Sequence, residues 1–401
     1  MTGIRTRKML NLAGAEAVMN AAEAQAKKQG SRVVIAVVDA TGNPILLRRL
    51  EGTQAASTNV AIDKARTAAI FVRPSRVLEE QVKSGRIGAL TLHGGVALIG
   101  GIPLTVNGEV VGAIGTSGET PDEDEAISIA GSKADFAVDE IKVLTYEGAQ
   151  RVANAAARLS IARGVAPVVA VVDIAGEPIY MWRPDQAQVA SVNVSIDKAR
   201  TAAIFRRPSK DFEDQVAHGR VSALALRGGV PLQGGMPLIY DGQVVGAIGV
   251  SGASSADEDQ ELATVGATVA ATFQEQSSKM AEVFHAPSDK VIAKFETGGL
   301  LLDTAQYKVD AGRRQAPGEV EFHNWVTDIM YVVQGTATVV TGGEMVNSRE
   351  VKTGEVRAEA IKGGATHHLA KGDVLVIPNG VPHQFTEVSK PFLYYVVKVE
   401  Q

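Results

Sequence analysis

A thirteen-residue segment occurs twice in this chain of 401 residues. Residues 59–71 read NVAIDKARTAAIF, and residues 193–205 read NVSIDKARTAAIF, with one substitution between them. Other short sequences recur at the same spacing: Arg73-Pro74 with Arg207-Pro208, Gly94-Gly95 with Gly228-Gly229, and Ser117-Gly118 with Ser251-Gly252. The pattern indicates that one structural module was duplicated, so the chain must accommodate two copies of one fold.

The repeated segment has the periodicity of an α-helix. At about 100° per residue, its apolar residues share one arc with Lys64, while Asp63 and Thr67 fall on the opposite, polar side. The alanines of that arc allow close packing against a sheet. Lys64, and Lys198 in the second copy, must either extend to the sheet edge or point into a cleft and bind an anion or a carbonyl group. Both interpretations stay open.

The overall composition describes an ordinary globular protein, with 45% hydrophobic and 21% charged residues. The net charge of −5 favours neither nucleic acid nor an anionic membrane as a partner. No apolar run reaches the length of a membrane span, and the N-terminus lacks the features of a signal peptide. The absence of cysteine excludes disulfides and leaves nitrogen and oxygen as the main metal ligands. We expect a cytoplasmic location.

Turn and helix signals divide the first copy into a regular order of elements. We predict a helix, a hairpin, two helices, a second hairpin and a final helix, at residues 10–28, 33–48, 59–84, 101–114 and from 122 onward. Asn107-Gly108 forms the second hairpin turn, and the second copy follows the same order. This order predicts an α+β module with a mostly antiparallel sheet.

The domain organisation follows from the repeat and from a change of pattern near residue 291. We expect the first module at 1–141, the second at 142–276 and a linker at 277–290. From residue 291 to 401, short strands alternate with glycine turns, which predicts a third, all-β domain.

Both modules carry the same ordered set of motifs. They are Lys64–Ala69, Gly94-Gly95, Gly100–Leu104 and Gly112–Gly118 in the first module, and Lys198–Ala203, Gly228-Gly229, Gly234–Leu238 and Gly246–Gly252 in the second. Taken together they resemble the GlcG/HbpS family, also called the haem-degrading or PduO C-terminal-like domain. The resemblance implies a five-stranded antiparallel sheet with helices, assembly into oligomers, and haem or corrinoid-related ligands.

For the ligand of these modules, the residues favour a small anionic molecule, and haem is the alternative. Haem iron usually needs an axial His, Cys, Met or Tyr, but His93 corresponds to Arg227 and His218 to Ser84, so neither histidine is shared. The candidate ligand-binding residues combine basic side chains with glycines that admit a ligand close to the backbone: Lys64, Arg66, Gly94, Gly95, Lys198, Arg200, Gly228 and Gly229. Lys64 and Lys198 are also candidate catalytic groups.

Two segments of the C-terminal domain carry a second resemblance. Residues 372–383 read GDVLVIPNGVPH, and residues 321–335 read EFHNWVTDIMYVVQG. They resemble the two motifs of a cupin, a small double-stranded β-helical barrel, with the first motif degenerate. The resemblance implies four candidate metal ligands, with Glu321 and His323 at the two histidine positions, Asp328 at the glutamate position and His383 in the second motif. Glu387 replaces the closing asparagine.

Strand periodicity supports this set, because residues 321 and 323 point to the same face of a strand. Two histidines with two carboxylates suit Mn, Fe, Ni or Zn and leave positions for a substrate. The alternative is a barrel that holds an organic ligand, or nothing, without metal. His367 and His368 alternate faces, and we expect them to be structural or surface residues.

Carboxylates recur at equivalent places in the two modules. Asp39 and Asp173 end a strand, where an aspartate usually bonds the backbone of its own turn. Asp122 with Asp124, and Asp257 with Asp259, begin a helix, where a negative charge stabilises the N-terminus. Acid–base chemistry is the alternative for the strand-ending aspartates, and a functional carboxylate cluster is the alternative at the helix starts.

Three functional hypotheses follow. The leading one is a metal-dependent enzyme, such as an oxygenase, lyase or isomerase, that acts on a small polar, carboxylate-bearing molecule; Asp328 serves as ligand or base, and the tandem modules hold a second ligand pocket. The second is a non-catalytic protein that binds or senses haem or a small ligand, with a structural cupin. The third places catalysis at Lys64 and Lys198. In each case we expect a homo-oligomer without nucleic-acid or membrane partners.

Overall fold

The computed structural model describes residues 2–275, 283–304, 307–352 and 354–400. The chain divides into two compact units, Thr6–Val143 and a second formed by Met1–Arg5 with Leu144–Gln401. The expected linker, residues 277–290, lies partly outside the described residues, and its last residues open a short helix, α9 (Ser288–Thr297). No helix of the described ranges has the length and apolar character needed to cross a bilayer.

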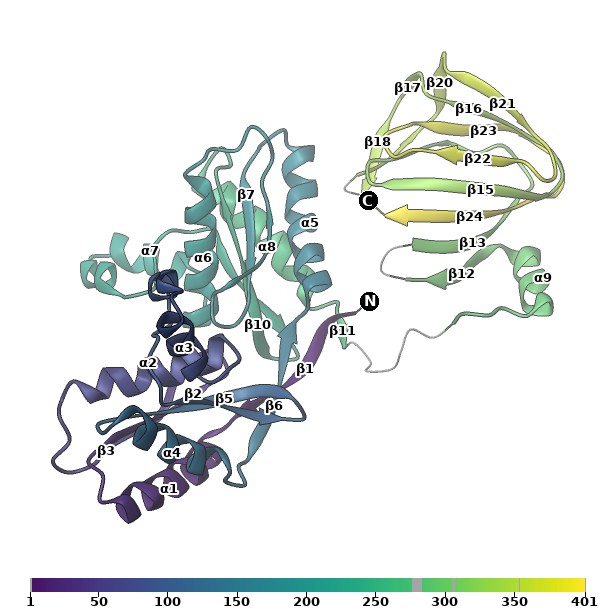
Figure 1. The fold of residues 1–401 in the computed structure, drawn as a ribbon. Coiled ribbons are helices and arrows are strands. Elements are labelled where there is room, and N and C mark those ends of the chain that lie inside the picture. Colours follow the sequence, from purple (N-terminus) through teal and green to yellow (C-terminus); the bar gives the residue numbers. More distant parts are fainter. Residues whose placement is uncertain (1, 276–282, 305–306, 353, 401) are drawn as a thin grey trace. The chain divides into compact units, whose positions relative to one another are not determined.

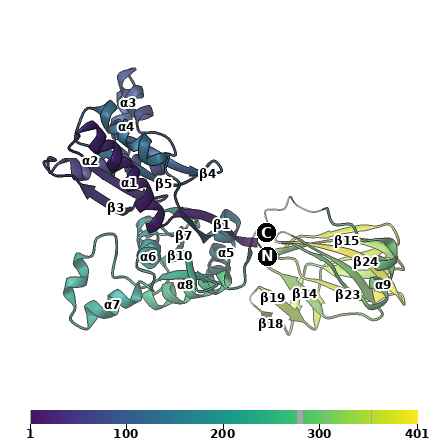
Figure 2. The same cartoon turned by 90° about the horizontal axis from the view of Figure 1, so that it is seen from below.

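The first module is a three-layer α/β/α arrangement around one antiparallel sheet of order β3-β2-β5-β4. Figure 1 shows α2 on one face of this sheet, and Figure 2 shows α1 and α4 side by side on the other. The elements are β2 (Val34–Asp39), β3 (Pro44–Arg49), β4 (Gly101–Val106), β5 (Glu109–Ser117), α1 (Leu12–Gln29), α2 (Ser57–Ile70), α3 (Arg76–Lys83), the 3-10 helix η1 (Ile87–Thr91) and α4 (Pro121–Ser132).

Strand β2 shows why the sheet is covered on both faces. Its first five residues are all buried, and they alternate between two cores, because successive side chains of a strand point to opposite faces. Ile35 and Val37 pack with α1 and α4, whereas Val34 and Val38 face the alanines of α2. The continuous apolar run of this strand is therefore the sequence signal of a middle layer.

The second module repeats this architecture with a sheet of order β8-β7-β10-β9. Helix α6 covers one face, and α5 and α8 cover the other. Its elements are α5 (Tyr146–Ala162), β7 (Val168–Val172), β8 (Pro178–Trp182), α6 (Ser191–Phe205), α7 (Lys210–Ala217), η2 (Val221–Ala225), β9 (Gly235–Tyr240), β10 (Gln243–Ser251) and α8 (Ala256–Ala270). The predicted order of elements and the α+β class are confirmed in both copies.

The structure differs from the sequence analysis at three points. Each sheet has four strands, whereas the family resemblance implied five. Sequence reasoning missed β6 (Val138–Leu144) and β1 (Thr2–Leu10), whose first residues pair in parallel with β11 (Gln274–Glu275). Thr67, expected on a polar face, is fully buried. Its hydroxyl donates to Asp63 O at 2.7 Å and accepts from the amide of Val96 at 2.8 Å. The loop after η1 thus covers the face that the periodicity suggested was solvated.

Glycines in β4 and β5 allow α2 to lie unusually close to the sheet. A Cβ added at Gly115 would lie 2.3 Å from Ala61 O, and one added at Gly101 would lie 2.0 Å from Lys64 O. The second module repeats both contacts, with Gly249 against Ser195 O at 2.0 Å and Gly235 against Lys198 O at 2.1 Å. The alanine-rich helix and the glycines of the sheet are therefore complementary parts of one tight interface.

In its described residues, the C-terminal domain consists of strands apart from α9, as the sequence predicts (Figure 1). Its two main antiparallel sheets share one hydrophobic core. The five-stranded sheet has the order β12 (Gly299–Asp303), β13 (Tyr307–Arg314), β24 (Phe392–Glu400), β15 (Val326–Gln334) and β22 (Val374–Ile377). The six-stranded sheet has the order β18 (Arg349–Lys352), β19 (Glu355–Ala358), β14 (Val320–His323), β23 (His383–Val388), β16 (Ala337–Thr341) and β21 (Ala365–Leu369). A small ribbon joins β17 (Glu344–Val346) and β20 (Ala360–Lys362).

The close packing of α2 on the sheet predicts that one added methyl group at Gly115 destabilises the protein. Gly115→Ala should lower the free energy of unfolding by about 1–3 kcal/mol, because the new Cβ meets backbone atoms of α2 that no side-chain rotation can move. The measurement is urea unfolding followed by circular dichroism. Gly88→Ala is the matched control, since nothing lies within 4 Å of a Cβ there. Equal stability of the two variants would contradict the close packing.

Candidate functional site

The four side chains predicted as metal ligands come together between the two sheets of the C-terminal domain. Glu321 and His323 lie on β14, and His383 starts β23, where it pairs directly with Glu321. Asp328 lies on β15 of the opposite sheet. Face-to-face packing of the sheets therefore converges residues that are far apart in the sequence.

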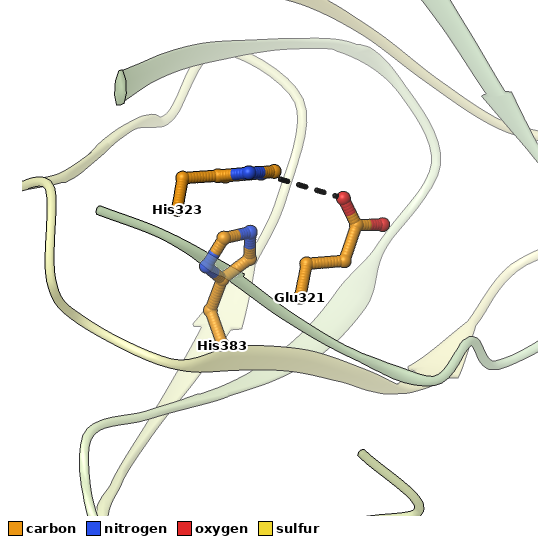
Figure 3. Close-up of side chains that lie close together, drawn as sticks. All are labelled: Glu321, His323 and His383. Atoms are coloured by element: carbon orange, nitrogen blue, oxygen red, sulfur yellow. Dashed lines mark ion pairs between the residues drawn. The ribbon is translucent and has the colours of Figure 1, made fainter. Parts of the chain in front are cut away.

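Glu321, His323 and His383 form a compact cluster, shown in Figure 3. One potential ligand atom from each lies within 4.8 Å of the others. Nε2 of His323 is 3.8 Å from Oε2 of Glu321 and 3.8 Å from Oδ2 of Asp328, and Nε2 of His383 is 3.6 Å from the same Asp328 oxygen. These separations exceed hydrogen-bonding distance, so the groups surround a point without bonding directly to one another.

Burial makes this cluster costly unless something binds it. His323, Asp328 and His383 are 6%, 1% and 2% exposed. Within the described residues, Nδ1 of His323, Oδ1 of Asp328 and Nε2 of His383 are buried without a hydrogen-bond partner. A buried polar atom left unsatisfied costs about 1–3 kcal/mol. Of these three atoms, Nε2 of His383 faces the cluster, 3.6 Å from Oδ2 of Asp328, so a group bound there would satisfy it.

His383 is held in the state that binds metals. Its Nδ1 lies 3.3 Å from Val381 O, which assigns the proton to Nδ1 and the lone pair to Nε2. Burial lowers the pKa of His383, and this outweighs the nearby charge of Asp328, which raises it. At neutral pH the imidazole is therefore uncharged, as a metal ligand must be.

Glu321 is already bound by two arginines. Arg314 Nη2 donates to Oε1 at 2.8 Å, and Arg357 Nη1 forms an ion pair with Oε2 at 2.9 Å. Burial raises the pKa of Glu321, but His323 and the two guanidinium groups together hold it well below its usual range. Glu321 is thus ionised with both oxygens engaged. Of the two carboxylates, Asp328 is better placed to offer an oxygen to a metal.

Lys398 is part of the cluster, although sequence reasoning missed it. Its Nζ lies 3.3 Å from Oδ2 of Asp328 and 3.4 Å from Nε2 of His323. The residue lies on β24 directly opposite Asp328 of β15. A lysine inside the apolar run FLYYVV-K-V was the available signal, but it lies outside both predicted motifs.

A cavity of about 510 Å³ opens beside the cluster. Its lining includes the candidate ligands Glu321, Asp328 and His383 together with Arg313, Arg314 and Lys398. The guanidinium of Arg314 stacks 4.2 Å from the Phe385 ring and donates to the Tyr394 hydroxyl at 3.2 Å. The cavity therefore presents cationic side chains next to the candidate ligands.

The predicted lysines of the tandem modules lie in a different environment. Lys64 is 5% exposed, and its ammonium donates to Asp124 Oδ2 at 2.8 Å and to Thr116 O at 2.9 Å. Lys198 repeats this with Asp259 at 2.8 Å and Val250 O at 3.0 Å. Each lysine thus forms a buried ion pair with the carboxylate that the sequence marked as a helix-capping group. A ligand of these lysines would have to replace that carboxylate.

The other predicted ligand-binding residues make contacts within their own modules. Arg66 donates to Gly42 O and to Asp63, both at 3.2 Å, and Arg200 pairs with Asp197 at 3.3 Å. The paired glycines lie against the end of the repeated helix: a Cβ added at Gly95 or Gly229 would meet Phe71 or Phe205, and one added at Gly94 or Gly228 would meet Ile70 or Ile204. Their role in ligand binding stays a prediction.

The strand-ending aspartates serve their own turns. Asp39 Oδ1 accepts from the amides of Thr41 at 2.8 Å and Asn43 at 3.0 Å, and Asp173 does the same for Ala175 and Glu177. These bonds are those of the turn interpretation.

Fold and site together define a protein of two tandem α/β/α modules followed by a strand-rich domain with a buried histidine–carboxylate cluster. Residues 10–133 and 144–268 both match the family described as haem degrading protein HbpS-like. Because these segments make up more than half of the chain, the chain belongs to this family.

Individual relatives match one module each. Protein GlcG of Escherichia coli K12 is 33% identical over 114 residues, which is 28% of this chain and 85% of the relative. An uncharacterised 15.0 kDa protein of Citrobacter freundii is 34% identical over 128 residues, 31% of this chain and 89% of the relative. Among solved structures, HbpS is 33% identical with a TM-score of 0.30, covering 31% of this chain and 88% of that one. PduOC in complex with haem is 25% identical with a TM-score of 0.30, and the match covers 33% of this chain and 97% of that one.

The buried ion pair between Lys64 and Asp124 predicts an effect on stability. Lys64→Met should lower the free energy of unfolding by about 3–5 kcal/mol at pH 7, because it leaves the Asp124 carboxylate buried and unpaired. Replacing both partners, as Lys64→Met with Asp124→Leu, should recover most of that loss. Denaturant unfolding of the single and double variants measures the coupling.

The same pair predicts a pH dependence. Burial raises the pKa of Asp124 and Lys64 lowers it, with burial the larger effect. In Lys64→Met the lowering effect is gone, so the pKa rises further. A raised pKa in the folded state favours folding at acid pH, where Asp124 is protonated, and this advantage is lost as the pH rises. The deficit of Lys64→Met should therefore shrink on acidification; a deficit that grew would contradict the assignment.

Proposed function

We propose that this chain is a metal-dependent enzyme that acts on a small polar, carboxylate-bearing molecule in a cupin-type C-terminal domain. The observation that carries the proposal is the buried cluster of His323, Asp328 and His383, in which Nε2 of each histidine lies 3.6–3.8 Å from Oδ2 of Asp328. Asp328 and His383 also line the cavity of about 510 Å³. Buried polar atoms normally have partners, and Nε2 of His383 has no hydrogen-bond partner among the described residues. A cation bound in the cluster would supply that partner.

The donor set fits a divalent transition metal. His323 and His383 supply imidazole nitrogens, Asp328 supplies the carboxylate oxygen, and Glu321 is the remaining candidate. Nitrogen and oxygen donors of this kind suit Mn, Fe, Ni or Zn. When bound, such a metal supplies Lewis-acid or oxygen-activating chemistry.

The side chains of the cavity wall suit an anionic substrate. Arg314 is held by Glu321, Tyr394 and the ring of Phe385, so its guanidinium has a fixed orientation. A fixed, planar guanidinium recognises a carboxylate with little loss of entropy. Asp328, nearly fully buried with one oxygen free of hydrogen bonds, would serve as a metal ligand or as a base.

The tandem modules give the second candidate function, a haem- or small-ligand-binding role. It is supported by their family, described as haem degrading, and by the relative that was solved with haem. In this proposal the pocket residues are those around Lys64, Arg66, Lys198 and Arg200, the lysines being the catalytic groups if the modules react with the ligand. A Soret band on haem titration would favour this function, and its persistence in His383→Ala would place haem outside the C-terminal domain.

Exposed apolar residues at equivalent positions support assembly into a homo-oligomer. Ile87 and Leu90 of the first module are each 60% exposed, and their counterparts Val221 and Leu224 are 60% and 58% exposed. Each pair lies three residues apart on a 3-10 helix, so its two side chains share one face. Neighbouring exposed apolar side chains of this kind favour an interaction surface. We expect light scattering to show more than one chain per particle, and Leu90→Glu with Leu224→Glu to reduce the mass; a monomeric wild type would refute this.

The metal proposal predicts the outcome of elemental analysis. Protein purified without added metal should contain a near-stoichiometric amount of one transition metal, and His383→Ala should lose it because the buried Nε2 donor is gone. His368→Ala is the matched control, since His368 is exposed and contacts Thr338 on the outer surface. Inductively coupled plasma mass spectrometry measures all three proteins.

The outcomes separate the two functions. Metal in the wild type and the control but not in His383→Ala supports the proposed enzyme. A lack of metal in all three, even after incubation with Mn, Fe, Ni or Zn, would overturn it and leave the haem- or ligand-binding function of the tandem modules.

A further inference from the structure

We propose that Lys398 is an internal cation that occupies the metal-ligand atoms when no metal is bound, and thereby sets how tightly this site binds metal. The inference rests on the proposed metal site and concerns its regulation by a residue of the chain itself. Lys398 belongs to neither motif that identified the ligands.

The first support is geometric. Lys398 Nζ lies 3.3 Å from Oδ2 of Asp328 and 3.4 Å from Nε2 of His323. One ammonium group thus contacts a carboxylate and an imidazole nitrogen that are both candidate metal ligands. A metal bound by those two atoms would lie where the ammonium now interacts.

The second support is the distribution of charge. Glu321 is neutralised by Arg314 and Arg357. In the described part of the chain, the one lysine or arginine that forms an ion pair with Asp328 is Lys398. A carboxylate that is 1% exposed is strongly destabilising without a nearby positive charge. Lys398 therefore provides the compensating charge that a metal ion would otherwise provide.

The third support is the mobility available to the side chain. The Lys398 side chain is 27% exposed, whereas that of Asp328 is 2% exposed, and Lys398 lines the cavity of about 510 Å³. The ammonium can therefore move into the cavity without unpacking the core. A metal ion and an ammonium repel each other strongly at such short separation in a poorly solvated site, so metal binding requires this movement. After it, Lys398 faces the cavity, where it can bind the carboxylate of a substrate.

The test removes the charge and keeps most of the side chain. Lys398→Met should bind Zn²⁺ or Mn²⁺ at least about tenfold more tightly than the wild type, because no ammonium has to be displaced. The measurement is isothermal titration of chelator-treated protein with each metal. In the metal-free state the variant should also melt at a lower temperature, and added metal should restore its melting temperature.

Lys308→Met is the matched control. Lys308 lies opposite Lys398 in the register of β13 and β24, but it pairs with Asp303 and does not line the cavity. Its replacement should leave metal affinity unchanged, so a change common to both lysine variants would overturn the inference.

The remaining outcomes distinguish this inference from the proposed function. Equal or weaker metal binding by Lys398→Met, with a wild type that binds metal, overturns the role of Lys398 and leaves the metal enzyme standing. Binding by Lys398→Met but not by the wild type supports the internal cation and overturns the metal dependence of the natural protein. No binding by either protein overturns both.

Discussion

Charge buried away from water is the constraint on which the interior of this protein depends. An ionised group taken out of water needs a partner of opposite charge or a set of hydrogen bonds. Each tandem module meets this need with one lysine and one aspartate, Lys64 with Asp124 and Lys198 with Asp259. The C-terminal domain meets it with two arginines on Glu321 and with Lys398 beside Asp328.

The same constraint accounts for the thirteen-residue repeat. The segment carries three requirements at once: a lysine that reaches a buried carboxylate, alanines small enough for close packing, and a threonine that ties the helix to the following loop. The glycines of β4 and β5 meet this helix at backbone distance. These contacts constrain the lysine, the threonine and the alanines, and all of them are the same in both copies except Ala61, where the second copy has Ser195.

Sequence reasoning succeeded where the signal is local. Periodicity and turn signals such as Asn107-Gly108 were enough for the helices and hairpins of each module. The spacing of residues 321 and 323 was enough to place two candidate ligands on one strand face. It failed where partners are distant in the chain. The pairing of Lys64 with Asp124, the burial of Thr67 under a loop and the approach of Lys398 to Asp328 depend on tertiary packing, and no local pattern specifies them.

The two kinds of buried charge differ in a way that bears on function. In the modules, the lysine and the aspartate satisfy each other, and Thr116 O or Val250 O completes the ammonium's contacts. A reactive lysine needs its lone pair free, so this arrangement favours stability over chemistry. In the C-terminal domain, the polar groups are only partly satisfied. Lys398 contacts Oδ2 of Asp328, while Oδ1 of Asp328 and Nε2 of His383 have no hydrogen-bond partner among the described residues. An interior that tolerates such atoms is stabilised by whatever binds them, and that places the search for chemistry in the C-terminal domain.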